Sequence, residues 1–137
     1  MDVQKRITAA WQGRISGCLL GKPVEGMSMR EGKDFMESYL KEVKSYPVRD
    51  YINYAENPHI RGINIKCCKG RIDKAEQDDD ITYLVLALMM LERYGLDLST
   101  DDVARSWINL LPAGATFTAE REAYLKLLTH MDFAYQF

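Results

Sequence analysis

The stretch EQDDDITYLVLALMMLERYG, residues 76–95, places three adjacent aspartates directly in front of a long apolar run. Leucine, alanine and methionine dominate this run, and such residues favour a helix over a strand. Gly95 supplies a natural stop after the last polar turn. The pattern therefore predicts a helix over residues 80–94. Because Leu84–Leu91 is apolar around the whole helical circumference, we expect this segment to be buried on every side.

The aspartates Asp78, Asp79 and Asp80 allow two interpretations. Acidic side chains at a helix N-terminus are favourable by about 0.3–1 kcal/mol each, and one of them can cap a backbone amide. However, two carboxylates about 5 Å apart repel by roughly 3 kcal/mol at an effective dielectric constant near 20. A divalent Mg²⁺ or Mn²⁺ reverses that repulsion, because hard cations bind several anionic oxygens. Composition alone leaves both a capping cluster and a metal site open.

Two further helices are predicted in the first half of the chain. Ile7, Trp11 and Ile15 recur on one face of a first helix. We expect that helix to end near Gly21, because Pro23 biases the preceding residue away from helical angles. The segment Gly32–Val43 has the pattern of a short amphipathic helix.

From Ser45 to Ala75 the helical pattern is interrupted by proline and glycine, which predicts a long connection with a short helix at Arg49–Ala55. Connections of this length in compact domains are commonly functional or flexible. The connection includes the basic segment IKCCKGRIDK, residues 65–74, which could meet phosphates, although a solvated loop is the commoner role for such a segment.

The C-terminal third shows clear local signals for helices. Ser99 and Asp102 have the spacing of a capping box, which predicts a helix through Leu110. Pro112 then interrupts the chain, and Thr118 can cap a last helix. Since no stretch alternates like a strand, the sequence predicts an all-α protein.

Composition excludes several classes of protein. The 137 residues suit one domain, and the longest apolar run is far short of the ~20 residues that a transmembrane helix needs. The N-terminus lacks the apolar core of a signal peptide, and the three cysteines form no zinc motif. His59 and His130 do not neighbour an aspartate. We expect a cytoplasmic protein without a histidine-based site.

Three stretches together resemble a known family, and they are ISGCLLGKPVEGM (Ile15–Met27), QDDDITYLVLAL (Gln77–Leu88) and ERYG (Glu92–Gly95). They are similar to the N-terminal half of the ADP-ribosylglycohydrolase family. In that family an opening helix runs into a Gly-x-Pro-x-Glu turn, and a Thr/Asp-Asp-Asp-Thr motif later begins a buried helix. The stretch LPAGATFTAEREAYLKLL, residues 111–128, also resembles a segment that follows this helix in bacterial members.

The resemblance implies an all-α hydrolase with two Mg²⁺ ions, or Mn²⁺ in their place. Such an enzyme cleaves the bond from the anomeric carbon of ADP-ribose to a protein side chain or small acceptor. Asp79 and Asp80 match the family's metal-binding pair, and Asp78 stands where many members have threonine. Glu25 matches a glutamate near the metals, as an acid/base or ligand, whereas a surface turn residue is its ordinary interpretation. Ile81 replaces the second threonine of the motif.

The family's second acidic cluster, of Asp-x-Asp type, has no counterpart after Asp102, since the only later aspartate is Asp132. We therefore expect residues 1–137 to be the N-terminal part of a single ADP-ribosylglycohydrolase-like domain. Weak metal binding and little or no hydrolysis are expected from this chain alone. Incomplete coverage of the Leu84–Leu91 segment also predicts exposed apolar surface and self-association.

Partners follow from these expectations. The resemblance implies an ADP-ribose-containing small molecule or an ADP-ribosylated protein as the substrate. Neither a membrane nor a nucleic acid is expected as a partner. Two other classes of function stay open, namely a non-catalytic helical module that binds ADP-ribose or a protein, and a metal-dependent nucleotide phosphohydrolase that uses the same aspartates.

Overall fold

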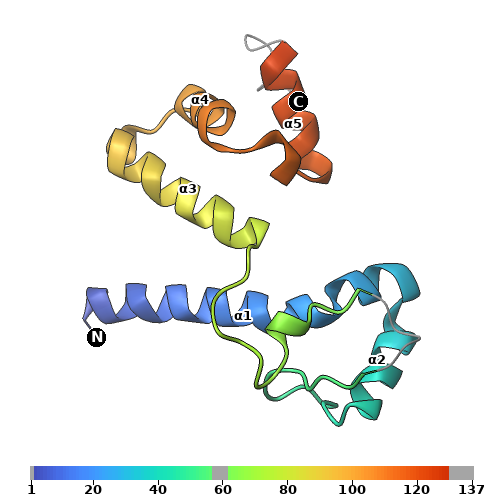
Figure 1. Ribbon diagram of the computed structural model, residues 1–137. Coiled ribbons are helices and arrows are strands. Elements are labelled where there is room, and N and C mark those ends of the chain that lie inside the picture. Colours follow the sequence, from blue (N-terminus) through green and yellow to red (C-terminus); the bar gives the residue numbers. More distant parts are fainter. Residues whose placement is uncertain (1, 57–61, 130–137) are drawn as a thin grey trace. The chain divides into compact units, whose positions relative to one another are not determined.

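The computed structural model describes residues 2–56 and 62–129. These residues form five α-helices and three short 3-10 helices and contain no strand, which confirms the predicted all-α class (Figure 1). The chain divides into two compact units, Met1–Asp78 and Asp79–Phe137, and each is described by itself. No described helix is both long and apolar enough to cross a membrane. His59, His130 and Asp132 lie outside the described residues.

The first helix, α1 (Val3–Glu31), continues well beyond Gly21, so the predicted end was wrong. Pro23 lies inside the helix, where its missing N–H and its ring cost about 3 kcal/mol. Pro23, Val24 and Met27 are nevertheless buried. Burying each large apolar side chain contributes about 1.5–3 kcal/mol, which offsets the cost of the proline. Tertiary packing therefore keeps the helix going where the local sequence favours a stop.

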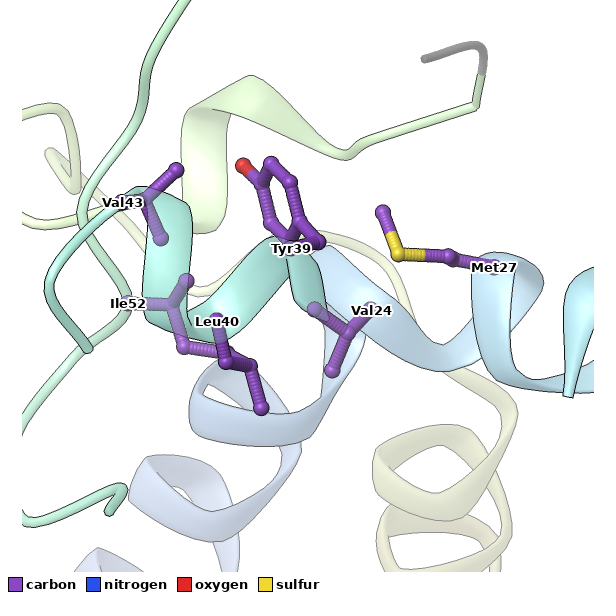
Figure 2. Packing of buried hydrophobic residues seen from close by; sticks show 6 residues of the cluster. All are labelled: Val24, Met27, Tyr39, Leu40, Val43 and Ile52. Carbon is purple, nitrogen blue, oxygen red and sulfur yellow. The ribbon is translucent and has the colours of Figure 1, made fainter. Parts of the chain in front are cut away.

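The second helix, α2 (Lys33–Glu42), confirms the predicted amphipathic helix and turns back against the end of α1 (Figure 1). Gly32 separates the two helices with φ 81°, a left-handed conformation that glycine adopts without strain. Figure 2 shows the apolar cluster that the two helices and the following chain enclose. Its buried members are Val24, Met27, Tyr39, Leu40, Val43 and Ile52.

The chain from residue 49 to residue 55 is not helical, so the short helix predicted there was wrong. Ile52 instead enters the apolar cluster with 1% exposure, and its carbonyl accepts a hydrogen bond from the Lys69 amide at 2.8 Å. The Asn53 amide donates to Ser45 Oγ, and its side chain donates to the Val43 carbonyl, both at 2.9 Å. These non-local bonds satisfy backbone groups that a helix would have paired locally.

A short 3-10 helix, η1 (Ile65–Cys67), packs against α1 within the first unit. Cys67 and the adjacent Cys68 have no exposed surface. The basic segment that includes these residues is thus anchored by two buried thiols, while its lysines stay at the surface. This anchoring fixes where the lysines lie.

The second unit consists of α3 (Asp79–Tyr94), α4 (Thr100–Leu110) and α5 (Thr118–Thr129), with 3-10 turns η2 (Gly95–Asp97) and η3 (Ala113–Ala115) between them. All three helices lie where the sequence predicts them. The capping box before α4 is also confirmed, because Ser99 Oγ accepts from the Asp102 amide and the Asp102 carboxylate accepts from the Ser99 amide.

The apolar helix α3 is buried on one side only, so the expectation of burial all round was wrong. Leu86 and Met90 pack with Leu111 and Tyr124 in the core of the second unit. Two short helices cannot surround a third, and four large apolar side chains of α3 are between 42% and 47% exposed: Val85, Leu88, Met89 and Leu91. The expected exposed apolar surface is therefore present on this helix.

Candidate functional site

The predicted site residues divide between the two units. Glu25 on α1 and Asp78 at the end of the first unit belong together, whereas Asp79 and Asp80 begin α3 in the second. The three aspartates are contiguous in the chain, but they differ in exposure. Asp78 is buried, and Asp79 and Asp80 are exposed. Asp78 is therefore largely shielded from solvent, whereas Asp79 and Asp80 are accessible to solvent and to ions.

Asp78 forms an ion pair with Lys22, whose Nζ donates to Oδ2 at 2.6 Å. The side chains of Lys22 and Asp78 are only 18% and 8% exposed, respectively. Burial by itself would lower the pKa of Lys22, but the hydrogen bond to Asp78 and the charge of that carboxylate outweigh it and raise the pKa. Lys22 thus stays a cation at neutral pH. Its charge compensates one of the three adjacent carboxylates.

Further polar groups of the first unit lie around this ion pair. Cys18 Sγ is within 4.8 Å of an Asp78 carboxylate oxygen. Burial raises the pKa of the Cys67 thiol, while the nearby Lys22 opposes that rise and Glu76 and Asp78 add to it. A thiol protonated at neutral pH is a poor metal ligand, because metals bind the thiolate. Cys67 is therefore a poor candidate for a metal ligand beside this ion pair.

Glu76 is the least satisfied carboxylate of the first unit. Its Oε1 is buried without a hydrogen-bond partner among the described residues, and its nearest ion-pair partner there is Lys66 Nζ at 3.8 Å. A buried carboxylate oxygen that lacks a close donor is costly. Glu76 is therefore a second acidic residue close to the ion pair, and like Asp78 it raises the pKa of the Cys67 thiol.

Glu25 is exposed on α1, three residues after Lys22. The family resemblance implies a turn at this point, and that implication is wrong for this chain, because residues 21–26 are helical throughout. The negative charge of Glu25 contributes to the raised pKa of Lys22. An exposed carboxylate beside a cation can exchange protons with solvent, which a general acid or base requires.

Asp79 and Asp80 lie in the first turn of α3. There the helix dipole favours negative charge, so a cation is not needed to account for either residue alone. Two exposed carboxylates ahead of a helix also offer hard oxygen donors of the kind that Mg²⁺ binds. Both interpretations of the sequence thus remain chemically sound at these two positions.

The sequence reasoning missed Lys22, Cys67 and Glu76 as neighbours of the candidate residues. Lys22 stands 56 positions before Asp78, and no periodicity links residues so far apart. The one available signal was the position of Lys22 inside the GKPVEG stretch, which also contains the candidate residue Glu25.

Comparisons with known proteins do not assign this chain to a family. No protein-family model, no curated protein and no solved structure matches this chain.

Proposed function

We propose that this chain contributes a carboxylate cluster to a magnesium-dependent site that hydrolyses the glycosidic bond of ADP-ribose to a protein side chain or small acceptor. The proposal assigns Mg²⁺ binding, or Mn²⁺ in its place, to Asp78, Asp79 and Asp80. Glu25 is assigned as the acid/base residue. The sequence resemblance supports these roles, and the observation that carries the proposal is the exposure of two adjacent carboxylates in the first turn of an apolar helix.

The donor set fits a hard cation in part. Asp79 and Asp80 present exposed carboxylates, which are the ligands that Mg²⁺ prefers. Asp78 already has an ammonium partner at 2.6 Å, so its contribution to a metal is smaller than the sequence suggests. We therefore expect Asp79 and Asp80 to dominate metal affinity, and Lys22 to hold Asp78 in position.

Bound Mg²⁺ would supply Lewis-acid charge that orients the vicinal ribose hydroxyls of the substrate. The chain's own residues would do the rest. Glu25 would pass a proton between solvent and the scissile bond, and the aspartate carboxylates would stabilise the positive charge that develops on the sugar. Residues 103–129 contain no pair of aspartates, so we propose little or no hydrolysis by this chain alone.

The test is a calorimetric titration of ADP-ribose into the protein, with and without Mg²⁺, beside an Asp79→Ala/Asp80→Ala variant. The matched control is Asp97→Ala/Asp101→Ala, which removes one exposed aspartate from the end of η2 and one from the first turn of α4 and changes the net charge equally. We expect heat only when Mg²⁺ and both aspartates of α3 are present. The control variant should bind like the parent.

Other outcomes would replace the proposal. Binding that is indifferent to Mg²⁺ would favour a non-catalytic helical module for ADP-ribose. Phosphate release from a nucleoside triphosphate would favour a metal-dependent phosphohydrolase. Absence of heat in every arm would reduce the aspartates to a capping cluster.

The exposed apolar face of α3 leads to a proposal about association. Val85, Leu88 and Met89 lie at helical spacing and are more than two-fifths exposed. Covering such a face removes apolar surface from water, so we propose that the protein self-associates at raised concentration. Light scattering that reports a monomer at every concentration would contradict this.

A further inference from the structure

A small hollow lies in the first unit, between the end of α2 and the basic segment. Its volume is about 130 Å³, and Lys44, Arg49 and Lys69 supply three cationic side chains to its lining, together with Asp50, Tyr51 and Asn53. Lys69 belongs to the basic segment 65–74, for which the sequence left contact with phosphates open. The hollow gathers this lysine with two cations from a different part of the chain.

The backbone around the hollow is held in place by defined bonds. Lys44 leaves α2 in a left-handed conformation with φ 56°, and the Asn53 side chain donates to the carbonyl before it. The Lys69 amide donates to the carbonyl of buried Ile52 at 2.8 Å. The backbone at Lys44 and Lys69 is therefore tied to the apolar cluster of the first unit, which positions two of the three cations of the lining.

The charges of the lining are unbalanced. Lys69 Nζ pairs with Asp50 Oδ2 at 2.6 Å, and Asp50 Oδ1 also accepts from the Tyr51 amide at 2.7 Å. The lysine and the backbone amide lower the pKa of Asp50, which keeps it a carboxylate. Neither Lys44 nor Arg49 has a carboxylate partner among the residues that the structure describes. Within the described part of the chain, the positive charges of Lys44 and Arg49 therefore lack an anionic partner.

We propose that this hollow binds the phosphate group of a small phosphorylated ligand. With a volume of about 130 Å³, the hollow holds more than a single water and has room for one tetrahedral oxyanion. Guanidinium and ammonium groups are the usual partners of phosphate, and charge-assisted hydrogen bonds to them are the strong ones. Asp50 already shows that an anionic oxygen is accepted at Lys69 and the Tyr51 amide.

The proposal predicts that substitutions of Asp50 and of Arg49 change the affinity for phosphate in opposite directions. Its carboxylate competes with an incoming phosphate for Lys69 and repels a dianion, so Asp50→Asn should tighten binding. Arg49→Gln should weaken it, because a charged donor is lost. We expect changes on the order of tenfold in each direction, because each substitution removes one charge that a bound phosphate would meet.

The experiment titrates inorganic phosphate and, separately, methyl phosphate into the whole chain without Mg²⁺, and follows the backbone amide resonances by NMR. The expected result is saturable shifts at Tyr51, Asn53 and Lys69. Tighter binding of methyl phosphate would identify a phosphate ester as the ligand class, whereas tighter binding of inorganic phosphate would identify the free ion.

Two matched controls separate this site from general charge effects. Arg14→Gln removes an exposed arginine from α1, and Glu37→Gln removes a half-buried carboxylate of α2 that pairs with Lys41, as Asp50 pairs with Lys69. Each changes the net charge by the same amount as its counterpart at the hollow but should leave the affinity unchanged. Equal effects of Arg14→Gln and Arg49→Gln would overturn the proposal, and so would absence of shifts at these amides. The Asp79→Ala/Asp80→Ala variant should bind phosphate normally, so this proposal and the proposed function can fail separately.

Discussion

The two units bury their apolar residues in different ways. In the first, α1 and α2 enclose a cluster that the irregular chain completes through Ile52. In the second, three consecutive helices supply the core, and α3 keeps an exposed apolar face. The first unit depends on contacts between residues far apart in the chain, whereas the second is built from neighbouring helices. The buried ion pair of Asp78 and the cationic hollow both lie in the first unit, because both require contacts between distant parts of the chain.

The two units also differ in net charge. Residues 1–78 contain 14 lysines and arginines and 11 acidic residues, whereas residues 79–137 contain 4 and 9. Like charges within one unit repel, and opposite net charges attract anions to the first unit and cations to the second. Phosphate binding in the first unit and metal binding at Asp79 and Asp80 in the second are both in keeping with this asymmetry.

The largest effect is expected from Ile52→Ala, which empties a fully buried site in the first unit. Large-to-small changes in a core cost about 2–5 kcal/mol of unfolding free energy. The first unit contains Trp11 and the second contains Trp107. In a Trp107→Phe background the fluorescence of Trp11 therefore reports urea unfolding of the first unit, and in a Trp11→Phe background that of Trp107 reports the second. The Trp11 transition should shift strongly, and Ile7→Ala, at a half-exposed position, serves as the control. An equal shift of the Trp107 transition would show that the units unfold together.

The next effect is expected from Lys22→Met, which leaves the buried Asp78 without its ammonium. We expect the first unit to lose about 2 kcal/mol, less than the 3–5 kcal/mol of a fully buried pair, because Lys22 keeps some contact with solvent. Since the pKa of Lys22 is raised, the stabilisation is fully present below the ordinary lysine pKa and is lost as the pH rises beyond it. Urea unfolding between pH 7 and pH 11 measures this.

The more exposed ion pair of Lys41 and Glu37, whose side chains are 59% and 30% exposed, provides a control for that experiment. Lys41→Met removes the same charge from the first unit, and we expect no measurable loss of stability. A loss as large as that of Lys22→Met would mean that net charge, and not the buried ion pair, accounts for the effect.

A smaller effect is expected in the second unit from Ser99→Ala, which removes the cap of α4. Loss of an N-cap hydroxyl costs about 1 kcal/mol, and the Trp107 transition should report it. Hydrogen bonds from Ser99 lower the pKa of Asp102, so their stabilisation is present above the ordinary aspartate pKa and is lost as the pH falls below it. The difference between the parent and Ser99→Ala should therefore shrink in acid. A constant difference would contradict the capping role of the carboxylate.

The smallest effect is expected from Tyr39→Phe in the first unit. The Tyr39 hydroxyl is buried without a hydrogen-bond partner among the described residues, so its removal should leave stability unchanged or raise it by up to about 1 kcal/mol. Burial raises the pKa of Tyr39 to about 12. The unfolded chain ionises earlier, so this tyrosine weakens the fold as the pH rises from 10 to 12. A Tyr39→Phe variant with the same alkaline slope as the parent would refute this account.

The helices of the second unit follow from the sequence alone, because their signals are local. The capping box of Ser99 and Asp102 and the stop at Gly95 depend on residues within one or two turns. The same local rules predicted an end at Gly21 and a helix at 49–55, and both predictions were wrong. In each case the deciding contact came from far away, through the burial of Pro23 and Met27 or of Ile52.

Local patterns in the sequence suffice to predict the all-α class, the position of α3 and the three adjacent carboxylates at its start. They do not predict that Asp78 pairs with Lys22, or that Arg49 and Lys69 line one hollow. A helix is held by hydrogen bonds between residues four positions apart, so residues close together in the sequence encode it. Ion pairs and hollows arise where folding brings distant segments together, and residues close together in the sequence carry no record of those contacts.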